Sequence, residues 1–183
     1  MPSVHYRDIL DFWFDEPTSK CWFNSTPEFD NLILKKYQNL WEQAAGGALD
    51  SWQTTHLGSL SLVIILDQLP LNMFRGTSKS FSTESSAIAV TRNAITKKFD
   101  LLLDTIQLPF LYMPLMHSEN LNDQNDSVHL FEQAGLESNL RFAKHHQNII
   151  KKYGRFPHRN VILNRPSTDD ELVYLSSPHA FKG

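Results

Sequence analysis

The sequence has few of the residues that mark specialised protein classes. Its one cysteine, Cys21, excludes an intramolecular disulfide and any zinc site built from several cysteines of one chain. It has only seven glycines, and 41% of its residues are hydrophobic, as in globular proteins rather than fibrous or disordered ones. The longest apolar region, residues 57–66, is much shorter than the ~20 residues of a membrane span. We therefore expect a globular protein of a reducing compartment, the cytoplasm, without a membrane partner; the composition does not exclude the nucleus.

The acidic residues near the start of the chain and the net charge disfavour two further classes, secreted proteins and nucleic-acid binders. Asp8, Asp11 and Asp15 break up the apolar residues near the start, so this segment does not resemble a signal peptide. The net charge of -3 and the pI near 6.2 disfavour a dedicated nucleic-acid binder. The length of 183 residues predicts one domain over residues 1–183, large enough to fold around a single core.

Acids are also missing locally, because no Asp or Glu occurs between residues 138 and 168. Within that stretch, residues 153–160 read Tyr-Gly-Arg-Phe-Pro-His-Arg-Asn. Gly154 is suited to end the preceding helix in a left-handed cap, and Pro157 prevents the helix from resuming. The cationic side chains of this loop must find acidic partners elsewhere in the chain or bind an anionic ligand.

Hydrophobic spacing predicts helices, and no segment alternates as a half-buried strand does. We expect helices at residues 4–14, 27–45, 57–69, 84–99, 118–131 and 137–152, and a short one that Thr168 begins. Residues 109–116, with two prolines, predict a turn or a short broken helix. The fold class is therefore all-α, with helices stacked as antiparallel hairpins.

Three predicted helices carry polar residues in notable places. Residues 57–69 are apolar nearly all round and predict a buried core helix that ends at Asp67-Gln68-Leu69-Pro70. Asp67 would then lie at the negative end of the helix dipole and need a partner, for which Arg75 is the nearest cation in sequence. We expect Asp67 to be structural. In the two later helices, Gln124, in a helix capped by Ser118, and His146 fall on apolar faces.

Four motifs, in this order, resemble the DUF924 family: residues 8–14, residues 67–76, His117-Ser118-Glu119 with Asp123-Gln124, and Gly154 to Asn160. The resemblance implies a tetratricopeptide-like all-helical fold across nearly the whole chain, without an established activity. The chain departs from the family's usual pattern in having Leu71 instead of Arg, Glu84 instead of Asp, and Asn164 instead of Gly.

The residues of these motifs predict a site for a small anionic ligand. Arginine suits two-pronged binding of carboxylate or phosphate, whereas histidine and a perturbed glutamate exchange protons near neutral pH. The candidate catalytic residues are His117, Glu119 and His158. The candidate ligand-binding residues are Arg75, Gln124, His146, Arg155, Arg159 and Asn160. Asp67, Asn72 and Asp123 are assigned structural roles.

Other interpretations of the same residues stay open. The arginines can instead pair with Asp67, Glu119 and Asp123 in a purely structural network. The chain would then be a tetratricopeptide-like module that binds a protein or peptide. A metal centre is disfavoured by the neighbouring arginines and by the absence of His-Glu-x-x-His, and nucleic acid by the net charge. We expect no cofactor.

Overall fold

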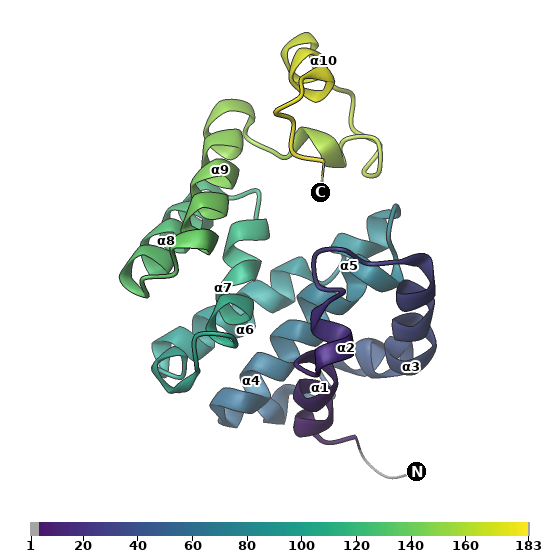
Figure 1. Cartoon of the computed structure of the whole chain (residues 1–183), viewed down its shortest axis with the longest axis vertical. Helices are drawn as coiled ribbons and strands as arrows, with labels where there is room; N and C mark the ends of the chain where they lie inside the picture. Colours follow the sequence, from purple (N-terminus) through teal and green to yellow (C-terminus); the bar gives the residue numbers. More distant parts are fainter. Residues whose placement is uncertain (1–3, 183) are drawn as a thin grey trace. The chain divides into compact units, whose positions relative to one another are not determined.

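The computed structural model describes residues 4–182, and over that range the chain forms helices and turns without any strand (Figure 1). This result confirms the predicted all-α class, while the tetratricopeptide-like stacking stays a prediction. Among the described residues, no helix is both long and apolar enough to cross a membrane. The chain divides into two compact units, residues 4–75 with 79–114 and residues 76–78 with 115–182, which are described separately. The single domain over residues 1–183 also stays a prediction.

The N-terminal unit is organised around one buried helical rod. The rod is made of α4 (His56–Val63), the π-helical turn η2 (Ile64–Gln68) and α5 (Leu69–Met73), and every residue from Gly58 to Pro70 is buried. The helices packed against parts of this rod are α1 (Tyr6–Trp13), α3 (Pro27–Ala45) and α6 (Glu84–Thr96). The remaining elements are α2 (Glu16–Ser19) and the short turns η1 (Asp50–Thr54) and η4 (Asp100–Leu102). The turn η3 (Ser78–Phe81) and the helix α7 (Leu108–His117) have residues in both units. The predicted core helix is therefore confirmed.

We predicted that this helix ends at Pro70, and that prediction was wrong. The chain passes through a π-helical turn and continues as a helix beyond Pro70. The Leu69 amide donates to the Ile64 carbonyl, five residues back instead of four. Pro70 has no N–H for the Leu66 carbonyl, and the Thr83 hydroxyl donates to that oxygen at 2.6 Å. The same hydroxyl accepts a 3.1 Å bond from Trp41 Nε1. The side chain that replaces the missing donor lets the helix continue to Met73.

Two further local predictions need correction. Residues 109–116 lie within the uninterrupted helix α7, in which Pro109 takes a first-turn position that needs no N–H donor. Thr83 precedes α6 as predicted, but its hydroxyl bonds Leu66 instead of capping the helix, and α6 ends at Thr96.

The C-terminal unit contains a helical pair followed by an irregular segment and a short helix. Its elements are α8 (Leu121–Gln133), α9 (Glu137–Tyr153), the single turn η5 (Pro157–Arg159) and α10 (Asp169–Ser176). The helices α8 and α9 pack side by side, joined by the turn 134–136 (Figure 1, green). Thr168 and Glu171 form a capping box at the start of α10, which confirms the predicted last helix.

Candidate functional site

The loop after α9 begins as the sequence predicts. Gly154 adopts a left-handed conformation with φ 69°, and its amide donates to the Ile150 carbonyl at 2.8 Å. Phe156 is fully buried and packs with Ile149 and Ile150. Pro157 then opens the single turn η5. The turn places the polar side chains of the loop around a buried aromatic ring.

Glu119 holds this loop from the segment before α8. Its Oε1 accepts bonds from the Phe156 amide at 2.8 Å and from Arg165 Nη2 at 2.9 Å, and its Oε2 accepts from Arg165 Nη1 at 2.6 Å. Burial works to raise the pKa of Glu119, but the bonds from Arg165 and from the Phe156 amide outweigh it and hold the pKa below its usual value. Glu119 is therefore an ionised, two-pronged partner of Arg165.

Glu171 holds the same loop from the first turn of α10. Arg155 Nε and Nη2 donate to its two oxygens at 2.7 and 2.8 Å. The Thr168 amide and the Asn160 side chain donate to Oε2 at 2.8 and 3.2 Å. The bonds from Arg155 are the main cause that lowers the pKa of Glu171 to about 2. The side chain is only 2% exposed, so this ion pair is desolvated on its acidic side.

Arg165 and Asn160 connect these two ion pairs. Arg165 Nε donates to Asn160 Oδ1 at 3.1 Å, while Asn160 Nδ2 donates to Glu171. Asn160 is fully buried. We call the five side chains of this network the loop clamp: Glu119, Arg155, Asn160, Arg165 and Glu171.

Arg159 and His158 lie beside the loop clamp. Arg159 is buried, donates to the His117 carbonyl at 2.8 Å, and holds its guanidinium 4.7 Å from the centre of the Phe156 ring. Burial, and next the charge of Arg159, lower the pKa of His158 to about 4. His158 is therefore neutral at pH 7, and its Nδ1 is buried without a hydrogen-bond partner among the described residues.

His146 faces inward, as its position on the helix predicts. Its ring lies 4.5 Å from Phe181 and 5.4 Å from Phe156, centre to centre, and Nδ1 donates to the Phe142 carbonyl at 2.8 Å. Burial lowers its pKa to about 3. His146 is thus a neutral core residue.

Gln124 is fully buried, as predicted, and anchors the turn before α8 through 2.7 Å bonds to the carbonyls of Met116 and Ser118. Asp123 accepts a 2.6 Å bond from the Ser118 hydroxyl. The predicted cap was wrong by two residues: Asn120 caps α8, because its side chain accepts from the Asn122 amide.

The predicted residues of the N-terminal unit form their own contacts. Arg75 donates to both oxygens of Asp30, at 2.6 and 3.2 Å, and to Asn72 Oδ1 at 3.2 Å. Asn72 also donates to the Gln68 carbonyl. Asp67 is buried inside the π-helical turn, and its carboxylate accepts a hydrogen bond from the side-chain amide of Gln68. Its predicted place at the end of a helix was therefore wrong.

The structure joins some predicted residues through partners that the sequence reasoning missed. His117, Glu119, Arg155 and His158 come from two segments bonded together through Phe156 and Arg159. However, Glu119 pairs with Arg165 and Arg155 pairs with Glu171. One signal was available: Asp169, Asp170 and Glu171 are the first acids after the acid-free stretch.

Neither of two hollows in the C-terminal unit is lined by His117, Glu119 or His158. One, of about 440 Å³, is lined by Lys152, Tyr153, Arg155, Thr168, Asp170 and Glu171. The other, of about 420 Å³, is lined by Arg141, Phe142, His145, Pro178, His179, Ala180 and Phe181. Within residues 4–182, no three His, Cys, Asp or Glu side chains gather as a metal ion requires.

Comparison with known proteins places the chain in a family. Residues 9–179 match the model of the family described as "Bacterial protein of unknown function (DUF924)". A solved structure from Agrobacterium tumefaciens, that of the protein of unknown function ATU0120, is 34% identical, with a TM-score of 0.89. The match covers 93% of this chain and 96% of that chain. No curated protein matches. The chain therefore belongs to DUF924, a family of bacterial proteins of unknown function.

Proposed function

We propose that this protein is a helical module that binds a protein or peptide partner with acidic groups, and that the loop clamp is structural. In this proposal, its helices are arranged in a tetratricopeptide-like way and present a basic surface. The loop clamp holds the segment after α9 in place and takes no part in chemistry.

The observation that carries this proposal is how fully the two clamp carboxylates are engaged. Both oxygens of Glu119 accept bonds from Arg165, and both oxygens of Glu171 accept bonds from Arg155. A carboxylate held this way stays ionised and is a poor proton donor or acceptor near pH 7. The guanidinium forks of Arg155 and Arg165 are likewise turned onto protein carboxylates rather than toward a ligand.

The exposed face of α9 supplies a surface for an acidic partner. It carries the exposed cationic side chains Arg141, Lys144, Lys151 and Lys152, and Glu137, in the first turn, is the one acid of α9. Lys144 also forms an exposed ion pair with Glu132 of α8, with Nζ 3.5 Å from Oε1. A cluster of positive charges attracts acidic partners and speeds their association.

A small anionic ligand is the second candidate, favoured by the hollow in which Lys152 and Arg155 lie together. In that case Arg155 and Arg159 would bind the anion, and His117, Glu119 and His158 would transfer protons. The hollow also contains Asp170 and Glu171, which repel an anion, so the binding module is our preferred function.

A comparison of two ligand sets tests this choice. Labelled acidic peptides are assayed by fluorescence anisotropy, and phosphate-bearing and carboxylate-bearing metabolites are assayed by thermal shift. We expect acidic peptides to bind with micromolar dissociation constants, basic peptides not to bind, and metabolites to leave Tm unchanged. If a metabolite raised Tm, and if Arg155→Ala with Arg159→Ala removed this effect while no acidic peptide bound, the small-ligand function would replace the binding module.

A further inference from the structure

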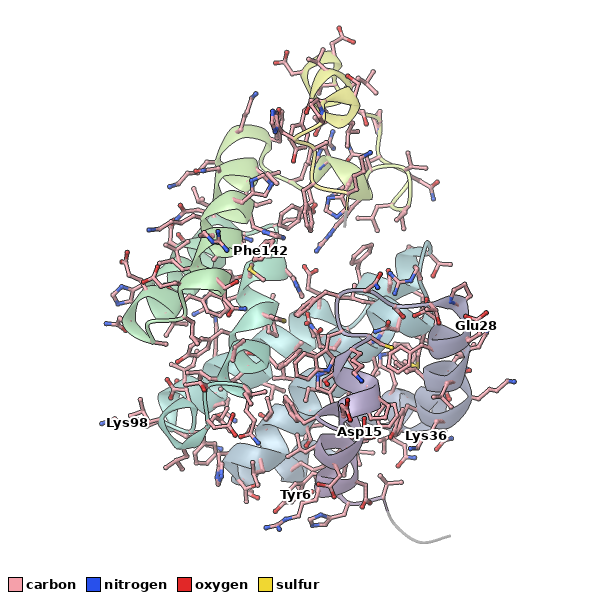
Figure 2. The ribbon with its side chains drawn as sticks, in the orientation of Figure 1. Tyr6, Asp15, Glu28, Lys36, Lys98 and Phe142 are labelled. Carbon is pink, nitrogen blue, oxygen red and sulfur yellow. The ribbon has the colours of Figure 1, made fainter. Side chains whose placement is uncertain are left out.

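The hollow beside the N-terminal half of α9 has an apolar interior and a basic edge. We call it the α9 hollow. One side is formed by Arg141, Phe142 and His145 of α9, and the other by residues 178–181 of the C-terminal segment. Phe142 of α9, labelled in Figure 2, is 54% exposed, so its ring is accessible to a ligand.

The C-terminal side of this hollow is built on the core of its unit. The Phe181 amide donates to the Tyr174 hydroxyl at 2.9 Å, and the Phe181 ring packs against the core cluster that contains Phe156. The rings of His146 and His158 lie 4.5 and 5.0 Å from the Phe181 ring, centre to centre. A ring fixed on several sides is preorganised, so a ligand loses little binding energy in ordering it.

The formal charge among the described residues that line the α9 hollow is that of Arg141. Arg141 and His145 lie four residues apart and so share a face of α9, and His179 contributes a second exposed imidazole. Among the residues that the structure describes, no Asp or Glu lines this hollow. Arginine binds carboxylates with two parallel hydrogen bonds, and aromatic and arginine side chains dominate the binding energy of protein interfaces.

We infer that the α9 hollow binds one large apolar side chain, aromatic or aliphatic, from an acidic segment of a partner protein. The apolar side chain would pack against Phe142 and Phe181, and carboxylates on either side of it would bind Arg141 and the two exposed histidines. This inference rests on the proposed function, to which it adds the site and the motif. The volume of about 420 Å³ is large enough to hold one aromatic or aliphatic side chain together with its flanking groups.

The test uses the full chain and a labelled probe decapeptide, in which one Phe is flanked on each side by two Glu in a Gly-Ser background. Two control peptides replace the Phe by Ala or every Glu by Lys. Affinity is measured by fluorescence anisotropy at low ionic strength. We expect the probe to bind at least about tenfold more tightly than either control, which corresponds to about 1.4 kcal/mol.

Two pairs of variants locate the binding site. Phe142→Ala and Arg141→Glu should each weaken probe binding by about tenfold or more. Leu172→Ala removes a side chain that is also 54% exposed, and Lys35→Glu reverses an exposed charge of α3, both outside this hollow and outside the basic face of α9. These two controls should change affinity by less than about threefold. All four positions are exposed, so each variant is expected to fold, and circular dichroism checks this.

The outcomes separate the site from the function. If the probe bound equally well to Phe142→Ala and Arg141→Glu, the α9 hollow would not be the site, although the protein would still be a binder of acidic peptides. If no acidic peptide bound the wild type, both proposals would fail. If the wild type sedimented as a dimer and Phe142→Ala as a monomer, the α9 hollow would be occupied by a second copy of this chain. That result would overturn the inference.

Discussion

Replacing Glu171 by Gln removes the charge that the loop clamp places against Arg155. Removing one partner of a buried ion pair typically costs about 3–5 kcal/mol. Here Arg155 is 26% exposed and keeps its bond to the Pro166 carbonyl, so water and that carbonyl stabilise part of the remaining charge. We therefore expect Glu171→Gln to lower the free energy of unfolding by about 2–3 kcal/mol at pH 7. For a chain of this size, that is a decrease in Tm of roughly 5–10 °C.

The pH dependence of this loss identifies its cause. The pKa of Glu171 is lowered to about 2 in the folded protein, below its ordinary value of 4.5. The ionised carboxylate therefore stabilises the fold above about pH 5, and this contribution is lost as pH falls through 4.5 toward 2. The difference in stability between the wild type and Glu171→Gln should decrease over that same range.

The assay must report on the C-terminal unit. The four tryptophans are at positions 13, 22, 41 and 52, all in the N-terminal unit, so their fluorescence would miss a local change. Urea unfolding followed by circular dichroism, together with hydrogen exchange at the Thr168 amide, avoids this problem. Asp169→Asn is the matched control, because it removes an exposed carboxylate from the same helical turn. Equal stabilities of Glu171→Gln and Asp169→Asn, or a difference that does not change with pH, would refute the reasoning.

Two further substitutions test local features of the fold by urea unfolding. Thr83→Val should lower the free energy of unfolding by about 2–4 kcal/mol, because it leaves the buried Leu66 carbonyl and Trp41 Nε1 without their partner. Thr83→Ser keeps the hydroxyl, so it should lower the free energy of unfolding by less than half as much. Equal effects of the two substitutions would contradict the role of the hydroxyl. Gly154→Ala should lower stability by about 1 kcal/mol, because an added Cβ meets no atom within 4 Å but φ is 69°, and an unchanged stability would show that the left-handed cap is unstrained.

The sequence predicted those parts of the fold that depend on local rules. Hydrophobic periodicity located the buried rod and the inward positions of Gln124 and His146, and the left-handed cap at Gly154 followed from residue type. Periodicity did not predict that the helix continues past Pro70, because this continuation depends on the Thr83 hydroxyl, which bonds the Leu66 carbonyl from seventeen residues further along the chain.

The sequence predicted that the basic loop needs distant acidic partners, but not which arginine pairs with which glutamate. The absence of acids near the basic loop indicated that its arginines need distant partners, and Glu119 does bond to that loop. Sequence spacing could not show that Arg165 would bind Glu119 while Arg155 bound Glu171, because both carboxylates are suitable by residue type. Between the two arginines the chain also turns at Asn164, which has a φ of 53°, a left-handed conformation that asparagine tolerates better than most residues.

The π-helical turn in the buried rod can also be viewed as the remnant of a one-residue insertion. Each residue of an α-helix advances the chain by about 100° around its axis. Deleting one residue between 64 and 68 would restore regular helical bonding there but rotate everything that follows by that angle. Arg75 would then turn away from Asp30 and lose its ion pair with α3. The family would therefore be expected to vary in length in its loops before it varies within this rod.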